Sequence, residues 1–157
     1  MESYKLNYKL SKKIYTIYKK ELQINMCYSN VYLIRNCLEL SNYNYQIAYG
    51  FFVDDEGIFT RHCFILLEDR TIIDPTFFIF AEEKEEETAE YFIIKTFNLT
   101  DYMEAVIRNK SDLSFGDLLI SEEIKKHDNL RKYGYKRNSY EIDEFLMRRL
   151  DTIDMQV

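Results

Sequence analysis

Apolar residues recur at helical spacing in the first quarter of the chain. Leu6, Leu10, Ile14 and Ile17 lie three or four residues apart, which predicts an amphipathic helix over about residues 8–21. A second apolar face begins near residues 25–27 and stops at turn-forming residues. Its members, at positions i, i+4, i+7 and i+11, are Cys27, Val31, Ile34 and Leu38. A second helix is therefore expected, with Asn25 as its N-cap.

The middle of the chain is rich in β-branched and aromatic residues, interrupted by turn-forming residues. The predicted strands cover 45–53, 58–67 and 71–74. A turn at 54–57 and a tight connection at 68–70 join them. Because Pro75 cannot donate a ladder hydrogen bond, residues 76–80 are expected either to resume the strand or to cross the core.

The remaining pattern predicts a strand over 91–97 and a helix over 99–108. Residues from about 115 to the end look mostly helical, with a break at 133–135. With no repeat and no linker, the whole chain 1–157 is expected to be one α+β domain. Its core would cover about residues 8–97 and its helical C-terminal part about residues 99–157.

The charge distribution argues against nonspecific binding to large anionic partners. The formal net charge is −6, which disfavours generic binding to nucleic acid or to an anionic membrane. Residues 131–137 are basic with two interleaved tyrosines, a pattern that can stack on bases or can simply end a helix. The second alternative is favoured because short basic clusters are common on protein surfaces. The tyrosine content is compatible with a homodimer.

The cysteines and the hydropathy indicate a cytoplasmic protein. No run approaches the roughly 20 apolar residues of a membrane span, and the N-terminus lacks the apolar core of a secretory signal. Three cysteines suit a reducing compartment better than a disulfide framework. Without C-x-x-C spacing and with two histidines, no zinc site or other cofactor is expected.

Candidate chemistry lies in three residues that appear in order: Cys27, His62 and Asp74. Cys27 begins the second helix, where the helix N-terminus favours a thiolate. His62 is within a predicted strand, and Asp74 ends the next one. Taken singly, each residue is more often structural. Their order and placement together favour an activated cysteine nucleophile.

Strand parity decides whether His62 and Asp74 can meet. A two-residue loop at 69–70 would point them to opposite faces, whereas a three-residue loop at 68–70 places them on one face as diagonal neighbours roughly 7 Å apart. The hypothesis therefore requires an odd loop or a bulge. The same parity turns Cys63 away from His62, and both Cys63 and Cys37 are expected to be buried.

These motifs resemble the transglutaminase-like cysteine enzymes of the papain-like group. The resemblance covers about residues 20–80, through the segments 27–31, 45–50 and 72–76, and is similar to a small bacterial and phage branch. It implies a papain-like core, in which the nucleophile on a helix N-terminus packs against an antiparallel sheet. It also implies a Cys27–His62–Asp74 triad and acyl transfer through a thioester.

In that scheme Cys27 is the nucleophile, His62 the general acid and base, and Asp74 the residue that orients His62. The Cys27 backbone N–H would face the oxyanion, with Gln23, Asn25 and Tyr28 as candidates for further oxyanion or substrate contacts. Tyr28 stands where many relatives carry Trp, and Cys63-Phe64 where they carry Ala-Trp.

Two functions remain open from the sequence. The first is an amide or isopeptide hydrolase (a protease, amidase or deamidase) or a transglutaminase-like enzyme, acting on a protein or peptide. The alternative is a non-catalytic protein-interaction module on the same fold, which the charged segments and the unmatched residues 81–157 favour.

Overall fold

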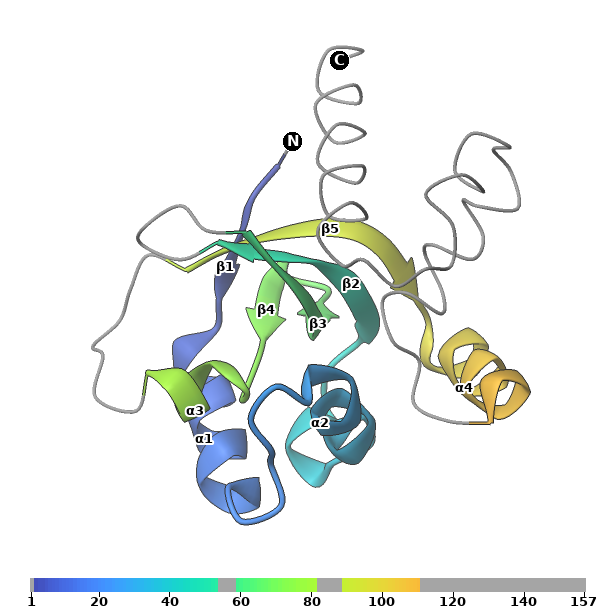
Figure 1. Ribbon diagram of the computed structural model, residues 1–157, viewed down its shortest axis with the longest axis horizontal. Coiled ribbons are helices and arrows are strands. Elements are labelled where there is room, and N and C mark those ends of the chain that lie inside the picture. Colours follow the sequence, from blue (N-terminus) through green and yellow to red (C-terminus); the bar gives the residue numbers. More distant parts are fainter. Residues whose placement is uncertain (1, 54–58, 82–88, 111–157) are drawn as a thin grey trace. The chain divides into compact units, whose positions relative to one another are not determined.

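The computed structural model describes residues 2–53, 59–81 and 89–110, and all of those from Ser3 onward belong to one compact unit. Its helices and strands alternate irregularly along the chain (Figure 1). In order they are β1 (Tyr4–Leu6), α1 (Tyr8–Tyr18), α2 (Cys27–Ile34), the 3-10 helix η1 (Leu38–Leu40), β2 (Tyr45–Val53), β3 (Phe59–Leu67), β4 (Thr71–Ile73), α3 (Phe77–Phe80), β5 (Glu90–Phe97) and α4 (Leu99–Asn109). The unit is therefore mixed α+β.

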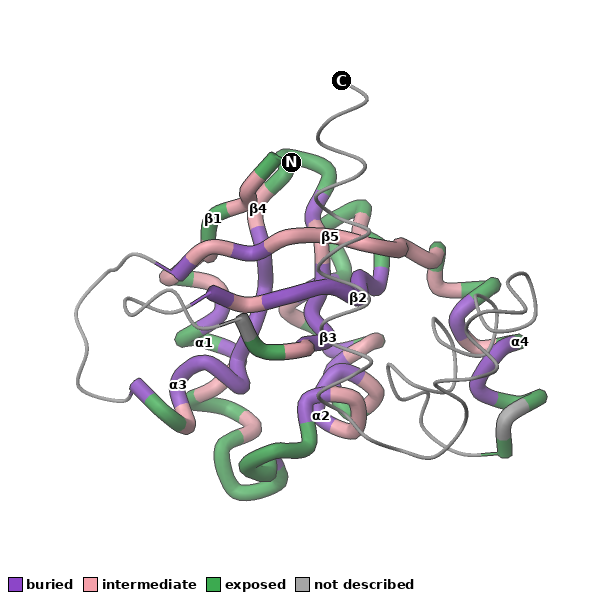
Figure 2. Tube along the Cα trace, turned by 45° about the horizontal axis from the view of Figure 1, so that its top comes forward, coloured by how far each residue is buried: buried purple, intermediate pink, exposed green. Residues whose placement is uncertain are grey.

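The five described strands close into a small barrel in the order β1-β4-β3-β2-β5. Neighbouring strands are antiparallel except β1 and β4, which run parallel. Figure 1 shows α1, α2 and α3 on one side of the strands and α4 beyond the end of β5. Burial is concentrated in the central strands β2 and β3 (Figure 2).

One core cluster lies on the inner face of the strands. It joins small and aromatic side chains from β2, β3, β4, α3 and β5: Ala48, Phe64, Ile72, Phe77, Phe78, Ala81, Ala89 and Tyr91. Tyr8 and Tyr15 of α1 pack their rings against Phe78, which holds α1 to this cluster. The apolar interior of the barrel thus extends to the helices on one side of it.

Most predicted strands are confirmed. Strand β2 has the predicted bounds, and β4 and β5 differ from the prediction by one residue at an end. Strand β3 ends at Leu67 as predicted, and residue 58, its predicted start, lies outside the described residues. The short strand β1 was not predicted, because Leu6 was assigned to a helical face. Long-range pairing with β4 and β5, which no local pattern records, forms this strand. The turn at 54–57 and the helices beyond residue 110 lie outside the described residues.

The helices differ more from the prediction. Helix α1 buries Ser11 and Ile14 but leaves Ile17 49% exposed. Helix α2 ends at Ile34, and Leu38 is 80% exposed in the separate helix η1. The Tyr45 hydroxyl of β2 donates to the Arg35 carbonyl, so a strand residue satisfies the helix end.

Two local predictions next to the helices are also corrected. Asn25 is not the N-cap of α2: its φ of 59° is left-handed, whereas an N-cap is extended, and Met26 occupies that place. Residues 77–80 form the short helix α3, not a resumed strand. The Phe77 and Phe78 side chains are buried in the core, whereas Phe80 is 60% exposed, so α3 packs one side against the core and does not cross it.

Candidate functional site

The β3–β4 hairpin brings His62 and Asp74 to the same face of the sheet. Ile65 pairs with Ile73 and Leu66 with Ile72, which leaves the three-residue loop 68–70 that the parity argument required. Arg70, third in this loop, takes the left-handed conformation with φ 70°.

Local hydrogen bonds explain how an arginine holds that position. The Arg70 backbone N–H donates to the Leu67 carbonyl at 3.0 Å. The Asp69 carboxylate accepts from the Thr71 backbone N–H at 2.9 Å and from its hydroxyl at 2.6 Å. This Asx-type bonding fixes the turn although no glycine is present in it.

His62 and Asp74 form a buried hydrogen-bonded pair. The His62 Nε2 and Asp74 Oδ2 atoms are 2.7 Å apart, and Asp74 is only 2% exposed. The Tyr91 hydroxyl donates to the same Oδ2 at 2.8 Å. From α1, the Ser11 hydroxyl accepts the Asp74 backbone N–H at 3.1 Å. Three separate elements therefore fix the carboxylate and its backbone.

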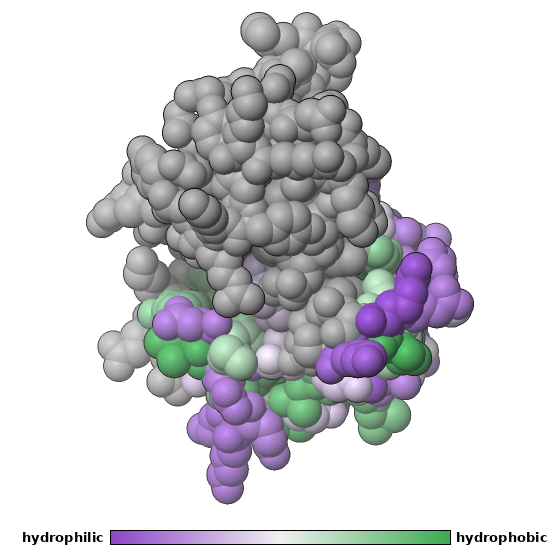
Figure 3. Space-filling view, turned by 45° about the vertical axis from the view of Figure 1, so that its right-hand side comes forward, coloured by the Kyte–Doolittle hydropathy of each residue, from purple (hydrophilic) through white to green (hydrophobic). Residues whose placement is uncertain are grey.

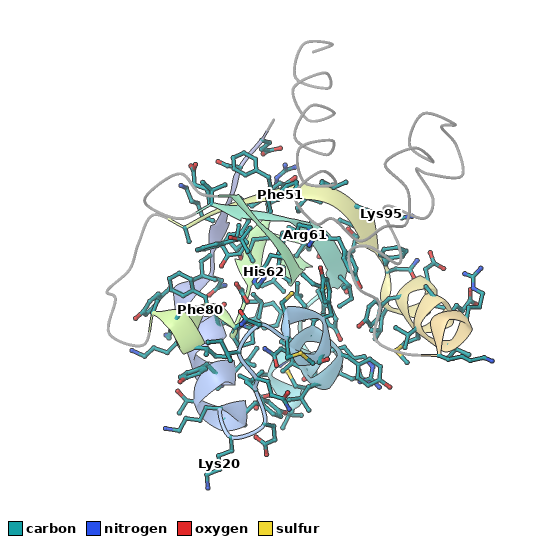
Figure 4. The ribbon with its side chains drawn as sticks, viewed as in Figure 1. Lys20, Phe51, Arg61, His62, Phe80 and Lys95 are labelled. Carbon is teal, nitrogen blue, oxygen red and sulfur yellow. The ribbon has the colours of Figure 1, made fainter. Side chains whose placement is uncertain are left out.

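Cys27 completes the group from α2. It is the first residue of this helix, and the N-cap Met26 provides no side-chain hydrogen bond. The Cys27 side chain lies close enough to His62 for its hydrogen-bonding and charge effects to help raise the pKa of the imidazole. Since Nε2 faces Asp74, the second ring nitrogen Nδ1 is the one available to the sulfur. Figure 4 shows His62 between the strands and the helices, whereas Lys20 points outward.

The electrostatics favour a charged imidazole. Burial by itself lowers the pKa of His62, but the Asp74 charge and hydrogen bond, with smaller effects from Cys27, outweigh it and raise the pKa to about 10. The raised pKa of His62 means that its imidazole is charged over most of the pH range. Cys27 and His62 retain 9% and 8% exposure, so the site lies near the surface and is only narrowly open.

Asn30 connects the two halves of the site. Its side-chain Oδ1 accepts the Gln23 backbone N–H at 2.9 Å, and its Nδ2 donates to the Gln23 carbonyl at 2.8 Å. The same Nδ2 donates to the Thr76 hydroxyl at 3.0 Å. Asn30 therefore ties α2 both to the segment before Cys27 and to the segment after Asp74.

The secondary candidates Gln23, Asn25 and Tyr28 lie around the N-terminus of α2. Gln23 is exposed, and its backbone groups are bound by Asn30. Asn25 is exposed in its left-handed conformation. The Tyr28 ring stacks on Tyr49 at 6.0 Å, and Tyr49 alternates to the sheet face opposite that of His62.

The other two cysteines are buried, as expected. Cys37 is 8% exposed, and burial followed by its hydrogen bond with Glu39 raises the pKa of this thiol to about 11. Cys63 is fully buried, and burial together with the charge of Cys27 raises its pKa well above the ordinary value. Both environments keep the thiols protonated and unreactive.

Sequence reasoning missed the residues that support the site: Ser11, Asn30, Thr76 and Tyr91. Ser11 had a weak signal, since a polar residue stands on the apolar face of α1. Tyr91 had none, because its partner is determined by strand order and not by its own surroundings in the sequence.

Within residues 2–53, 59–81 and 89–110, no cluster of three metal-ligating side chains occurs. No helix among these residues is long and apolar enough to cross a membrane. A scan against protein-family models, a search of curated proteins and a search of solved structures each found no match to this chain. The resemblance to transglutaminase-like enzymes therefore stays a prediction based on the residues of this chain.

Proposed function

We propose that this chain is a cytoplasmic cysteine acyl-transfer enzyme of the transglutaminase-like, papain-like kind, which cleaves an amide or isopeptide bond of a protein or peptide. The observation that supports it is that the His62 ring contacts Cys27 on one side and Asp74 on the other. An imidazole shared in this way stabilises a thiolate and can carry its proton through the reaction.

The first half of the proposed reaction forms a thioester. The Cys27 thiolate attacks the amide carbonyl carbon, and the oxygen takes up the negative charge. The Cys27 backbone N–H, at the uncapped start of α2, is the donor nearest to that oxyanion. The C–N bond then breaks, and the His62 imidazolium gives its proton to the leaving amine.

The second half returns the enzyme to its starting state. Neutral His62 accepts a proton from water, whose oxygen attacks the thioester carbonyl and expels the Cys27 thiolate. An amine in place of water would give transfer in place of hydrolysis by the same steps. Asp74 keeps the His62 ring oriented and balances the imidazolium charge in both halves.

The test is the rate of Cys27 alkylation by iodoacetamide as a function of pH, resolved by peptide mass spectrometry. We expect rapid alkylation well below the ordinary thiol titration near about pH 8.5 and a slower reaction in the His62→Ala variant. His127→Ala, which changes the only other histidine, is the control. Slow alkylation that is indifferent to His62 would refute the proposal.

Activity gives the second test once a substrate is found in a panel of peptide amides and glutamine peptides. Cys27→Ala is expected to abolish turnover, whereas Cys37→Ala and Cys63→Ala are expected to retain it. Turnover that survives Cys27→Ala would exclude the mechanism.

The alternative is a protein-interaction module without catalysis. The observation in its favour is the small exposure of Cys27 and His62, 9% and 8%. Eight large apolar side chains are exposed among the described residues, and on the face in Figure 3 hydrophobic and hydrophilic residues alternate in small patches. An ordinary thiol at Cys27, with a protein partner bound at such a surface, would favour this alternative.

A further inference from the structure

Two donors converge on one oxygen of Asp74. His62 Nε2 lies 2.7 Å from Oδ2, and the Tyr91 hydroxyl lies 2.8 Å from the same atom. The two donors come from β3 and β5, which are separated by β2 in the barrel. Closure of the barrel, and not proximity in the sequence, therefore brings the phenol to the carboxylate.

Packing fixes the direction of the Tyr91 hydroxyl. Tyr91 is fully buried. Its ring contacts Phe64 edge-on at 5.0 Å, Phe52 at 5.5 Å and the His62 ring at 6.4 Å. A buried phenol requires a hydrogen-bond partner, and here that partner is Asp74. Rings on three sides leave the hydroxyl little freedom to turn elsewhere.

A glycine permits the close approach of β5. The register between β2 and β5 shifts between Tyr49 and Gly50. A Cβ atom at Gly50 would lie 1.7 Å from the Phe92 carbonyl oxygen, the residue after Tyr91. Gly50 also pairs with His62 across the β2–β3 ladder. The glycine thus stands between the strand that carries His62 and the strand that carries Tyr91.

We propose that Tyr91 is a positioning residue, which acts through Asp74 to keep that carboxylate directed at His62. This inference rests on the function proposed above. A hydrogen bond from the Tyr91 phenol stabilises a carboxylate, and the carboxylate is the group that balances the His62 imidazolium. Without the Tyr91 hydroxyl, Cys27 alkylation is therefore expected to require a higher pH.

The surroundings of Asp74 support this assignment. The titratable groups that face it are His62 of β3 and Tyr91 of β5, with Cys27 of α2 reached through His62, while Cys63 experiences its charge from the opposite face of β3. Ser11 of α1 contacts its backbone and does not titrate. Burial first, then the Asp74 charge and hydrogen bond, raise the pKa of Tyr91 well above its ordinary value, so the phenol stays a donor throughout.

The test is the Tyr91→Phe variant, which keeps the ring and removes only the donor. We expect the acid-side midpoint of the Cys27 alkylation profile to move up by about one pH unit, the effect of losing one hydrogen bond to a charged group. Tyr102→Phe, in an equally buried tyrosine of α4, is the control and is expected to leave the midpoint unchanged. The His62 ring N–H signal in a nitrogen-15 NMR spectrum is expected to move only in Tyr91→Phe.

A ring-fluorinated tyrosine at position 91 keeps the test valid if Tyr91→Phe does not fold. This residue is a stronger donor of nearly the same size, so the acid-side midpoint is expected to move down. An unchanged midpoint in both variants, with alkylation still dependent on His62, would overturn the role of Tyr91 and leave the proposed function intact. Alkylation indifferent to His62 in the unmodified protein would overturn both.

Discussion

Removal of the Asn30 side chain tests whether the segments around the site are held by this one residue. Asn30→Ala deletes three hydrogen bonds, two with the Gln23 backbone and one with the Thr76 hydroxyl. At a net value of about 1 kcal/mol each, they contribute about 3 kcal/mol to the free energy of unfolding. Gln23 is exposed and can turn to water, but Thr76 is 2% exposed and would lose its donor, which costs about 1 kcal/mol more.

The expected loss is therefore about 4 kcal/mol, which for a domain of this size corresponds to a fall in melting temperature of about 10 °C. The assay is urea unfolding of the full chain followed by circular dichroism. Asn36→Ala is the matched control, because Asn36 lies just after α2 and is exposed. That control is expected to change stability by less than about 0.5 kcal/mol.

The same samples report on function. If Asn30 aligns Cys27 with the residues after Asp74, its loss slows Cys27 alkylation at neutral pH even below the unfolding transition. Equal stability of Asn30→Ala and Asn36→Ala would refute the reasoning, since it would mean that the three hydrogen bonds are replaced by water at no cost.

Three further outcomes are expected. Gly50→Ala forces a Cβ atom to within 1.7 Å of the Phe92 carbonyl oxygen. It is expected to lower the free energy of unfolding, measured in urea, by about 3 kcal/mol, and an unchanged value would show that β5 can move away from β2 without cost. Cys37, whose pKa is about 11, and Cys63, whose pKa burial raises well above the ordinary value, are expected to resist alkylation at pH 8 in the native protein and to react in urea; rapid native labelling would contradict their burial. The pKa of His62 is raised from 6.5 to about 10, so its contribution to stability is complete below about pH 6.5 and is lost as the pH rises through about 10. A melting temperature that does not fall between these pH values, or that falls equally in His62→Ala, would contradict this contribution.

Local patterns predicted much of the fold. The strands β2, β3 and β5 and the helix α4 each carry a clear apolar or periodic pattern, and turn-forming residues and Pro75 mark the two ends of β4. The sequence alone therefore located these elements. The prediction failed where another element decides the outcome. Met26, and not Asn25, is the N-cap of α2, and the Tyr45 hydroxyl donates to the Arg35 carbonyl where the helix ends. Both depend on contacts that no local pattern records.

The candidate site divides in the same way. The alternation of side chains along two strands was enough to state that His62 and Asp74 share a face only if the loop between the strands has an odd number of residues. The loop that ends at Arg70 has three. Parity follows from the alternation of side chains, which is a property of any strand. That Cys27 contacts His62 depends on how α2 packs against β3, which is a long-range arrangement.

The sequence by itself therefore determined the types of residue, their order and the face that each presents, because these follow from covalent geometry and spacing. Tertiary structure alone decided the rest. The burial of His62 beside Asp74 and the hydrogen bonds of Asn30 come from the packing of the helices against the strands, and the second donor, Tyr91, comes from barrel closure. Desolvation and hydrogen-bond partners are properties of three-dimensional neighbours. The β3–β4 hairpin makes neighbours of residues 62 and 74, and residue 91 joins them only when the barrel closes.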